Sequence, residues 1–237
     1  MPRSAKNAVT REEFDAIPTL VERTASYAPV PFSKMARICD EVVGSISDQY
    51  QSENISYYVN STQDEMLIQH RLYKDGKELG LSYEAMGSHN KTAANHFWGS
   101  NCVVWCNNGH MMADADVHWS GKHTPHKVTE VEEAAWAVLG QWQDTTEHAE
   151  EEMESMKSVA IDDDRFYEYT GLLYGHEIIK PRQMPLVHKE WHQPRHDAFA
   201  PRNMWSAYNA VTETFKSAPI GGHRQRHIAL SAITAGF

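Results

Sequence analysis

Apolar positions follow different rhythms along the chain, and each rhythm predicts a different kind of element. Within residues 33–50 they recur every three to four positions, at Met35, Ile38, Val42 and Ile46. This spacing predicts an amphipathic helix that Ser33 caps. Nearer the start of the chain, Thr10 and Glu13 stand at capping-box spacing, and we expect Pro18 to end the short helix that they begin.

From Ile55 to Trp119 apolar and polar residues alternate, which is typical of half-buried strands. Asp75-Gly76 separates two alternating runs, and Asn108-Gly109 separates Asn101–Asn107 from the run that ends at Trp119. Both turn residues of such a pair must tolerate positive φ, so each pair predicts a tight hairpin. The region therefore predicts an antiparallel β-meander of four to five strands.

Beyond Pro125 the helical rhythm returns. Thr129 and Glu132 have capping-box spacing, and one apolar stripe follows, at Val131, Ala135, Val138, Leu139 and Trp142. Further helices are predicted over Asp162–Tyr174, from Asn203 onwards, and from His223 to about Thr234. Residues 176–202 contain four prolines and no clean period, which predicts a long basic loop.

This order of helices, meander and helices predicts an α+β fold in which the meander packs with several helices. At 237 residues the chain fits a single domain, 1–237. We expect its segments to be N-terminal helices (1–50), the β-meander (51–120), helices (121–175), the basic loop (176–202) and C-terminal helices (203–237).

Composition excludes several classes of protein. Apolar residues make up 41% and charged residues 23%, which is ordinary for a globular protein and unlike a disordered one. No apolar run is long enough to span a bilayer, and the N-terminal residues lack a secretory signal. The three cysteines, Cys39, Cys102 and Cys106, are an odd number and fit buried thiols in a reducing cytosol.

Charge is distributed unevenly along the chain. The formal net charge is −10, yet residues 180–237 hold eight Lys or Arg against three acidic residues. Residues 130–168 hold thirteen Asp or Glu against only Lys157 and Arg165. We therefore expect an anionic ligand to prefer the C-terminal quarter.

Enzymatic chemistry has weak support. Cys102, Cys106 and His110 are of the right types for zinc, but they lie in a predicted strand–turn–strand, where a spacing of four does not gather ligands as a helix does. No nucleophile elbow or phosphate-binding glycine loop occurs. Asp162-Asp163-Asp164 suggests magnesium or, in the favoured interpretation, a helix cap. We expect no enzyme activity and no cofactor.

The C-terminal quarter interleaves cations with aromatic rings, which is the composition of a single-strand binder. In this interpretation the cations contact phosphates, and Trp191 or Phe199 stacks on bases. The candidate residues are Lys180, Arg182, Lys189, Trp191, Arg195, Phe199, Arg202, Arg224 and Arg226, with Lys34 and Arg37 as a weaker second group. The alternative is that the charges form a solvated face, and for Trp205 and Tyr208 a core position is favoured.

Four motifs resemble a phage- and plasmid-borne family catalogued as a domain of unknown function. They are Ser88-His89-Asn90, Val103-Val104-Trp105-Cys106-Asn107-Asn108, Lys122-His123-Thr124 and Trp205-Ser-Ala-Tyr-Asn-Ala-Val-Thr-Glu213. In size and character the chain also looks like the single-stranded-DNA-binding RNA polymerase cofactors of short-tailed bacterial viruses that carry a virion RNA polymerase. That resemblance implies a preference for unpaired DNA, a fold that is not an OB barrel, and a phage RNA polymerase as partner.

Together these observations predict a non-enzymatic, non-sequence-specific single-stranded-DNA-binding protein of a bacterial virus. We expect it to act early in phage transcription, in the cytoplasm of the infected host, as a homo-oligomer that makes no use of a membrane. The alternatives are a zinc-dependent enzyme built on Cys102, Cys106 and His110, and a host-directed interaction module that uses the acidic helix around Glu147–Glu154. The apolar tail Ala232–Phe237 either meets another subunit or closes its own core.

Overall fold

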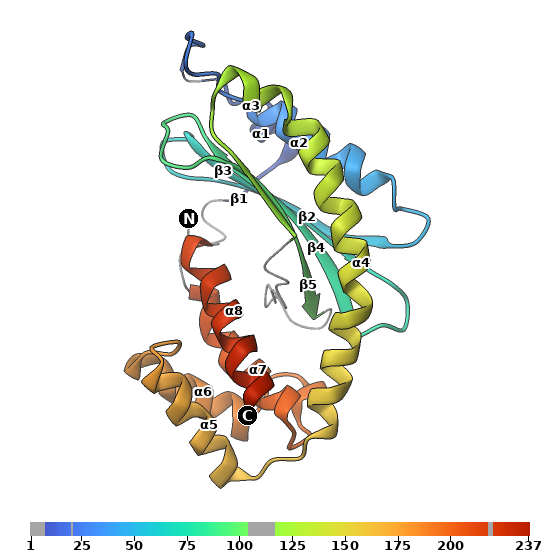
Figure 1. Ribbon diagram of the computed structural model, residues 1–237, viewed down its shortest axis with the longest axis vertical. Helices are drawn as coiled ribbons and strands as arrows, with labels where there is room; N and C mark the ends of the chain where they lie inside the picture. The colour runs from blue at the N-terminus through green and yellow to red at the C-terminus, as the bar shows by residue number, and fades with distance from the viewer. Residues whose placement is uncertain (1–7, 20, 104–116, 218–219) are drawn as a thin grey trace. The chain divides into compact units, whose positions relative to one another are not determined.

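The fold is of the α+β class, as predicted (Figure 1). The computed structural model describes residues 8–19, 21–103, 117–217 and 220–237. These residues fall into two compact units. Unit 1 holds the described residues up to Ser100 and those from Val117 to Asp144, and unit 2 holds 101–103 and the described residues from Thr145 to Phe237. The assignment of the whole chain to one domain stays a prediction.

An antiparallel meander forms the centre of unit 1. Its strands follow chain order, so that each pairs with the next and the sheet stays open, as predicted, with β1 and β6 at its two edges. The strands are β1 (Ala8–Val9), β2 (Gln51–Val59), β3 (Glu65–Tyr73), β4 (Leu79–Ser88), β5 (Asn95–Val103) and β6 (His118–Gly121).

Turn chemistry sets the register of this meander. Gly76 has φ +76°, the left-handed conformation that favours glycine, and it follows Asp75 in the predicted hairpin between β3 and β4. The hairpin predicted at Asn108-Gly109 lies outside the described residues. In β2 the register shifts between Ser52 and Asn54, which is a β-bulge at the strand next to the short edge strand β1.

One face of the sheet carries the apolar core. Ile68 and Tyr83 project from it, together with neighbours of the same parity, and all are almost completely buried. The other face is polar at its centre, where Gln69 Nε2 donates to Glu84 Oε1 over 2.7 Å. Both faces of β3 and β4 are buried, so almost every residue of these strands is buried. Simple alternation of apolar and polar residues instead predicts one exposed face.

The helices of unit 1 cover the apolar face. They are α1 (Arg11–Asp15), α2 (Phe32–Gly44), α3 (Pro125–Thr129) and the first part of α4 (Val131–Ser158). The capping box of Thr10 and Glu13 is confirmed. The cap by Ser33 is wrong, because α2 begins two residues earlier than that cap requires, after Pro31, which makes no side-chain cap. It also ends at Gly44 instead of running to about residue 50.

The helix α4 confirms its predicted stripe, because Val131, Ala135, Val138, Leu139 and Trp142 are all buried in the core of unit 1. Its predicted capping box is wrong. Thr124 instead caps the short α3, its side chain accepting from the Lys127 amide, and α4 follows directly. The later part of α4 exposes Glu151 and Glu154. Across the described part of the chain, no helix combines the length and apolarity that crossing a bilayer requires.

Unit 2 is helical. After the later part of α4 it contains α5 (Asp163–Gly175), η2 (Pro181–Gln183), α6 (Met184–His192), η3 (Asp197–Phe199), α7 (Met204–Thr212), η4 (Glu213–Ser217) and α8 (Ile220–Gly236). The caps by Asp162 and Asn203 are confirmed. The long loop predicted over 176–202 is wrong, since η2 and α6 fill 181–192. Pro181 and Pro185 occupy first-turn positions, where no amide donor is needed.

A half-buried polar network lies between α2 and the sheet in unit 1. Arg11 Nη1 donates to Asp40 Oδ2 and, over 3.0 Å, to Tyr57 Oη, while its Nε donates to Asp15 over 2.7 Å. His70 faces this network with only 1% of its side chain exposed. Burial lowers the pKa of His70 to about 4, although the Asp40 carboxylate opposes the shift.

We predict that His70 makes unit 1 less stable in mild acid. The unfolded chain takes up a proton on this imidazole near pH 6.5, whereas the folded chain does not do so until about pH 4. The free energy of unfolding that the neutral His70 contributes is therefore fully present above pH 6.5. It decreases as the pH drops toward 4 and stays constant below that pH. Urea unfolding at pH 7.0 and 4.5 should show a smaller loss for His70→Gln than for the unchanged protein. Equal losses would contradict this prediction.

Candidate nucleic-acid interface

The helices α5 and α6 of unit 2 are held together by stacked rings. Phe166 and Trp191 lie 4.4 Å apart, centroid to centroid, with their planes within 5°. Trp191 Nε1 donates to Asp163 Oδ1 over 2.7 Å, and only 3% of Trp191 is exposed. Trp191 is therefore an internal packing residue, and in this conformation it does not offer a face for base stacking.

Arg202 is drawn into the same contact. Its Nη1 donates to Asp163 Oδ1 over 2.6 Å, and its guanidinium carbon lies 4.6 Å from the centre of the Trp191 ring. The hydrogen bond from Trp191 is the main reason that the pKa of Asp163 is lowered, and Arg202 adds to the effect. The guanidinium predicted to contact phosphate is thus already paired with a carboxylate.

Arg195 is paired more completely. Its Nε lies 2.7 Å from Glu190 Oε1, and its Nη1 donates to Glu213 Oε1 over 2.6 Å. Both carboxylates are buried, at 8% and 6% exposure. Phe199 is also buried and contacts His196 edge to face. The structure therefore gives Arg195 and Phe199 structural roles, and it does not bring them together with exposed cations.

The remaining predicted residues differ in how available they are. Lys180 Nζ lies 3.3 Å from Glu177, whereas Arg182 and Lys189 are exposed and make no ion pair with another described residue. Arg226 lies 6.0 Å from the Phe215 ring centre, and the side chain of Arg224 falls outside the described part. In unit 1, Lys34 is half-buried and Arg37 pairs with Glu41 over 2.6 Å, both on α2.

A group of accessible rings on α5 and α6 was missed in the sequence. We call Tyr167, His188 and His192 the α5–α6 ring cluster. Tyr167 is 46% exposed, and its hydroxyl lies 3.4 Å from His188 Nε2 and 3.1 Å from His192 Nε2. The two imidazoles are 4.3 Å apart, centroid to centroid. His188 and His192 are four residues apart, a spacing that places two side chains on one face of a helix. Because residues 176–202 are predicted to be a loop, this pair is not identified in the sequence.

Two exposed cations lie close to the α5–α6 ring cluster in the sequence, and neither makes an ion pair with another described residue. Lys189 follows His188 directly on α6, and Arg182 precedes that helix by one turn. Tyr174, 51% exposed, lies two turns beyond Tyr167 on the same face of α5. Exposed rings stack on unpaired bases, and Lys and Arg neutralise phosphates, so this surface has both parts of a single-strand interface.

The surface also carries acidic side chains. Asp163 is occupied by Trp191 and Arg202, and Glu168 pairs with Arg165 over 2.8 Å, but Asp164 is exposed. Two of the carboxylates nearest the rings are therefore partly neutralised by cations of the same unit.

A metal centre has no support in the described residues. Cys102 is buried, while Cys106 and His110, its predicted partners, lie outside the described part. No three His, Cys, Asp or Glu side chains of the described residues gather into a set that could hold a metal ion. Asp162 accepts from the Arg165 amide, which confirms the cap interpretation of the acidic triplet.

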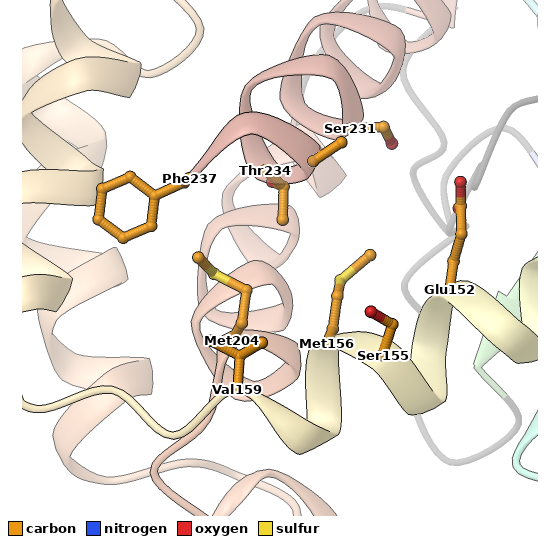
Figure 2. Close-up of a pocket in the computed structure, with 9 residues that line it drawn as sticks. Glu152, Ser155, Met156, Val159, Met204, Ser231, Thr234 and Phe237 are labelled. Atoms are coloured by element: carbon orange, nitrogen blue, oxygen red, sulfur yellow. The ribbon is translucent and has the colours of Figure 1, made fainter.

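Unit 2 also contains an apolar hollow of about 280 Å³ (Figure 2). Met156 from α4 and Met204 from α7 lie on one side of it, and Thr234 and Phe237 from the end of the chain lie on the other. The Phe237 ring packs against Tyr169 at 5.3 Å, so the apolar tail contacts its own unit. Among the described residues that line this hollow there is no cation, so it differs in character from the surface around the α5–α6 ring cluster.

Two histidines of the motifs behind the family resemblance have structural roles. His89 binds the Val30 carbonyl through Nε2 at 3.1 Å, and its own carbonyl accepts from Tyr27 Oη. His123 Nε2 binds the Ala93 carbonyl at 2.8 Å, and its carbonyl accepts from the Ala28 amide. These two histidines fix the segment before α2 to unit 1. The Trp205–Glu213 motif is completely buried in unit 2.

Comparison with known proteins gives a family and no activity. Residues 20–228 match the family described as Domain of unknown function (DUF932). No curated protein and no solved structure matches the chain significantly. Because the family match covers far more than half of the sequence, the chain belongs to the DUF932 family.

Proposed function

We propose that this protein binds single-stranded DNA without sequence specificity and assists a phage RNA polymerase at unpaired promoter DNA. The observation that carries the DNA-binding part is the accessible α5–α6 ring cluster, together with the exposed Arg182 and Lys189 near it in the sequence, which make no ion pair with another described residue. The viral and transcriptional setting rests on the resemblance of the sequence to phage proteins. The host cytoplasm and a homo-oligomeric state belong to the same proposal.

Unpaired strands suit this surface better than duplexes. Bases in a duplex are stacked on their neighbours, so exposed side-chain rings reach their faces only in a single strand. The cations are few and lie beside acidic side chains, which disfavours the dense phosphates of a duplex. The α5–α6 ring cluster is therefore expected to supply stacking, and Arg182 and Lys189 to supply phosphate contacts.

We predict that Arg182→Ala combined with Lys189→Ala weakens binding to oligo-dT about tenfold. The double variant should also reduce the slope of log affinity against log salt by about 1.4, because each phosphate contact on a single strand contributes about 0.7. Both side chains are exposed and unpaired among the described residues, so folding should be unaffected. Fluorescence anisotropy with labelled oligo-dT and a duplex of equal length, at two or more ionic strengths, measures both quantities.

The matched control is Arg23→Ala with Lys122→Ala, which removes two exposed cations from unit 1. Tyr167→Ala serves as a second readout, since loss of a stacking ring should weaken binding without changing the salt slope. If the unchanged protein binds neither oligonucleotide, the proposed function is wrong. If both double variants weaken binding equally, the interface lies elsewhere.

A further inference from the structure

A second candidate binding site lies in unit 1, where α2 faces β2 and β3. It is a cavity of about 510 Å³, within the range of small-molecule sites in proteins. Apolar and aromatic side chains form most of its wall, namely Val43, Tyr50, Ile55, Tyr57 and Leu72. Tyr57 is buried in this wall, while Ile55 lies at the rim with 42% of its surface exposed. These walls suit a flat, largely apolar ligand.

The polar groups of the cavity are few and incompletely satisfied. His70 lines it, is 1% exposed, and has no hydrogen-bond partner on either ring nitrogen among the described residues. Asp40 Oδ1, at 3.5 Å from His70 Nε2, does not satisfy it. The ring nitrogens of His70 are inaccessible, so the polar groups that a ligand can reach are the Asp40 carboxylate, which is 37% exposed, and the Tyr57 hydroxyl.

The charges around the cavity nearly balance, which favours an uncharged ligand. Arg11 is the cation of the lining, and it is already engaged by the carboxylates of Asp15 and Asp40 and by Tyr57. Lys74 Nζ also lies 4.4 Å from the centre of the Tyr50 ring in the wall, so two cations stand against the two carboxylates. Burial raises the pKa of Tyr57, so its phenol keeps its proton and remains a hydrogen-bond donor. The complementary ligand is uncharged, flat and able to donate N–H groups.

We propose that this cavity binds a nucleobase that carries an exocyclic amino group. The amino group would donate to Asp40 Oδ1, and an adjacent ring nitrogen or carbonyl would accept from the Tyr57 hydroxyl. The ring would lie against the aromatic and apolar wall. Adenine, guanine and cytosine have such an edge, whereas thymine lacks the amino group and should bind more weakly.

Two sources supply this chemistry, a free nucleoside and an unstacked base within a single strand. The inference does not rest on the proposed function, because the cavity lies in unit 1 and the α5–α6 ring cluster lies in unit 2. A nucleoside has no phosphate, so its binding is independent of the phosphate contacts assigned to Arg182 and Lys189.

The test uses the intact chain and a variant that closes the rim, Ile55→Trp. Because Ile55 is exposed, the larger ring should fill the mouth of the cavity without disturbing the core. The matched control is Leu172→Trp, an exposed apolar position of unit 2 with 46% exposure. Equilibrium dialysis with labelled adenosine, guanosine, cytidine and thymidine measures binding, and anisotropy with a mixed-sequence oligonucleotide follows the strand.

We expect the unchanged protein and Leu172→Trp to bind the three amino-bearing nucleosides at least fivefold more tightly than thymidine, and Ile55→Trp to lose this binding at least tenfold. If Ile55→Trp also weakens the oligonucleotide, the cavity receives a base of the strand; if it does not, the ligand is a free nucleoside. The proposal is overturned if none of the nucleosides binds and the strand is unaffected. It is equally overturned if Ile55→Trp and Leu172→Trp lose binding alike.

Discussion

Replacing Gly99 with alanine is expected to lower the free energy of unfolding by about 3 kcal/mol. A Cβ at this position of β5 would lie 2.5 Å from Cγ and 2.8 Å from Cβ of Trp142. Those atoms are close to the α4 backbone and fully buried in the core, so rotation of the side chain cannot relieve the clash. Either the strand or α4 has to shift, and urea unfolding followed by tryptophan fluorescence measures the cost.

Gly140→Ala is the matched control, because a Cβ there meets nothing within 4 Å and the position is exposed in the middle of α4. It should raise stability by roughly 0.5–1 kcal/mol through helix propensity. If the clash is the cause, Trp142→Ala, which removes Cγ and leaves only the 2.8 Å contact with Cβ, should cost less in the Gly99→Ala background than in the unchanged protein. A Gly99→Ala variant with an unchanged urea midpoint would contradict the packing described for unit 1.

Arg195→Ala is expected to lower stability by about 2 kcal/mol, through loss of two ion pairs and not through loss of a ligand contact, because the carboxylates are buried while the guanidinium is half exposed. The substitution leaves the buried carboxylates of Glu190 and Glu213 without their cation. Removing one partner of a buried pair costs more than the pair contributes, because the remaining charge stays desolvated. Arg195→Lys should recover only part of the loss, since one ammonium replaces a two-pronged contact.

Two further measurements separate a structural role from a DNA-binding role for Arg195. Glu213→Gln in the Arg195→Ala background removes one stranded charge and should restore part of the stability. Oligo-dT affinity, measured on the fraction that remains folded, should change by less than twofold. Full stability together with a large loss of affinity would instead support the phosphate contact that the sequence predicts for this residue.

Much of the fold follows from local patterns. Several predicted features are confirmed because each depends on neighbouring residues alone. They are the apolar stripe of α4, the turn at Gly76, and the caps at Thr10, Asp162 and Asn203. The prediction of a loop over residues 176–202 is wrong because proline affects helices in two opposite ways. It interrupts the interior of a helix but is well suited to a first turn, and which applies depends on where the helix begins.

The candidate site was harder to predict than the fold. The pattern of cations and rings located the relevant part of the chain, and α6 does expose Lys189 there. It did not distinguish Trp191, whose ring stacks inside on Phe166, from Tyr167, whose ring is accessible. Whether a ring is buried depends on its contacts with distant residues. Trp191, for example, donates to Asp163, which is 28 residues away in the sequence. Contacts at that separation leave no local signal.

The margin of the sheet at β2 has a consequence for how copies of this chain would associate. Among the described residues, β1 pairs only with Tyr57 and Tyr58, and the start of β2 carries a bulge and the polar residues Gln51, Ser52 and Asn54. A kinked, hydrophilic border is a poor template for a foreign strand. If the protein multimerises, we expect helical surfaces to join the copies, and we expect concentrated samples to resist fibril growth from this border.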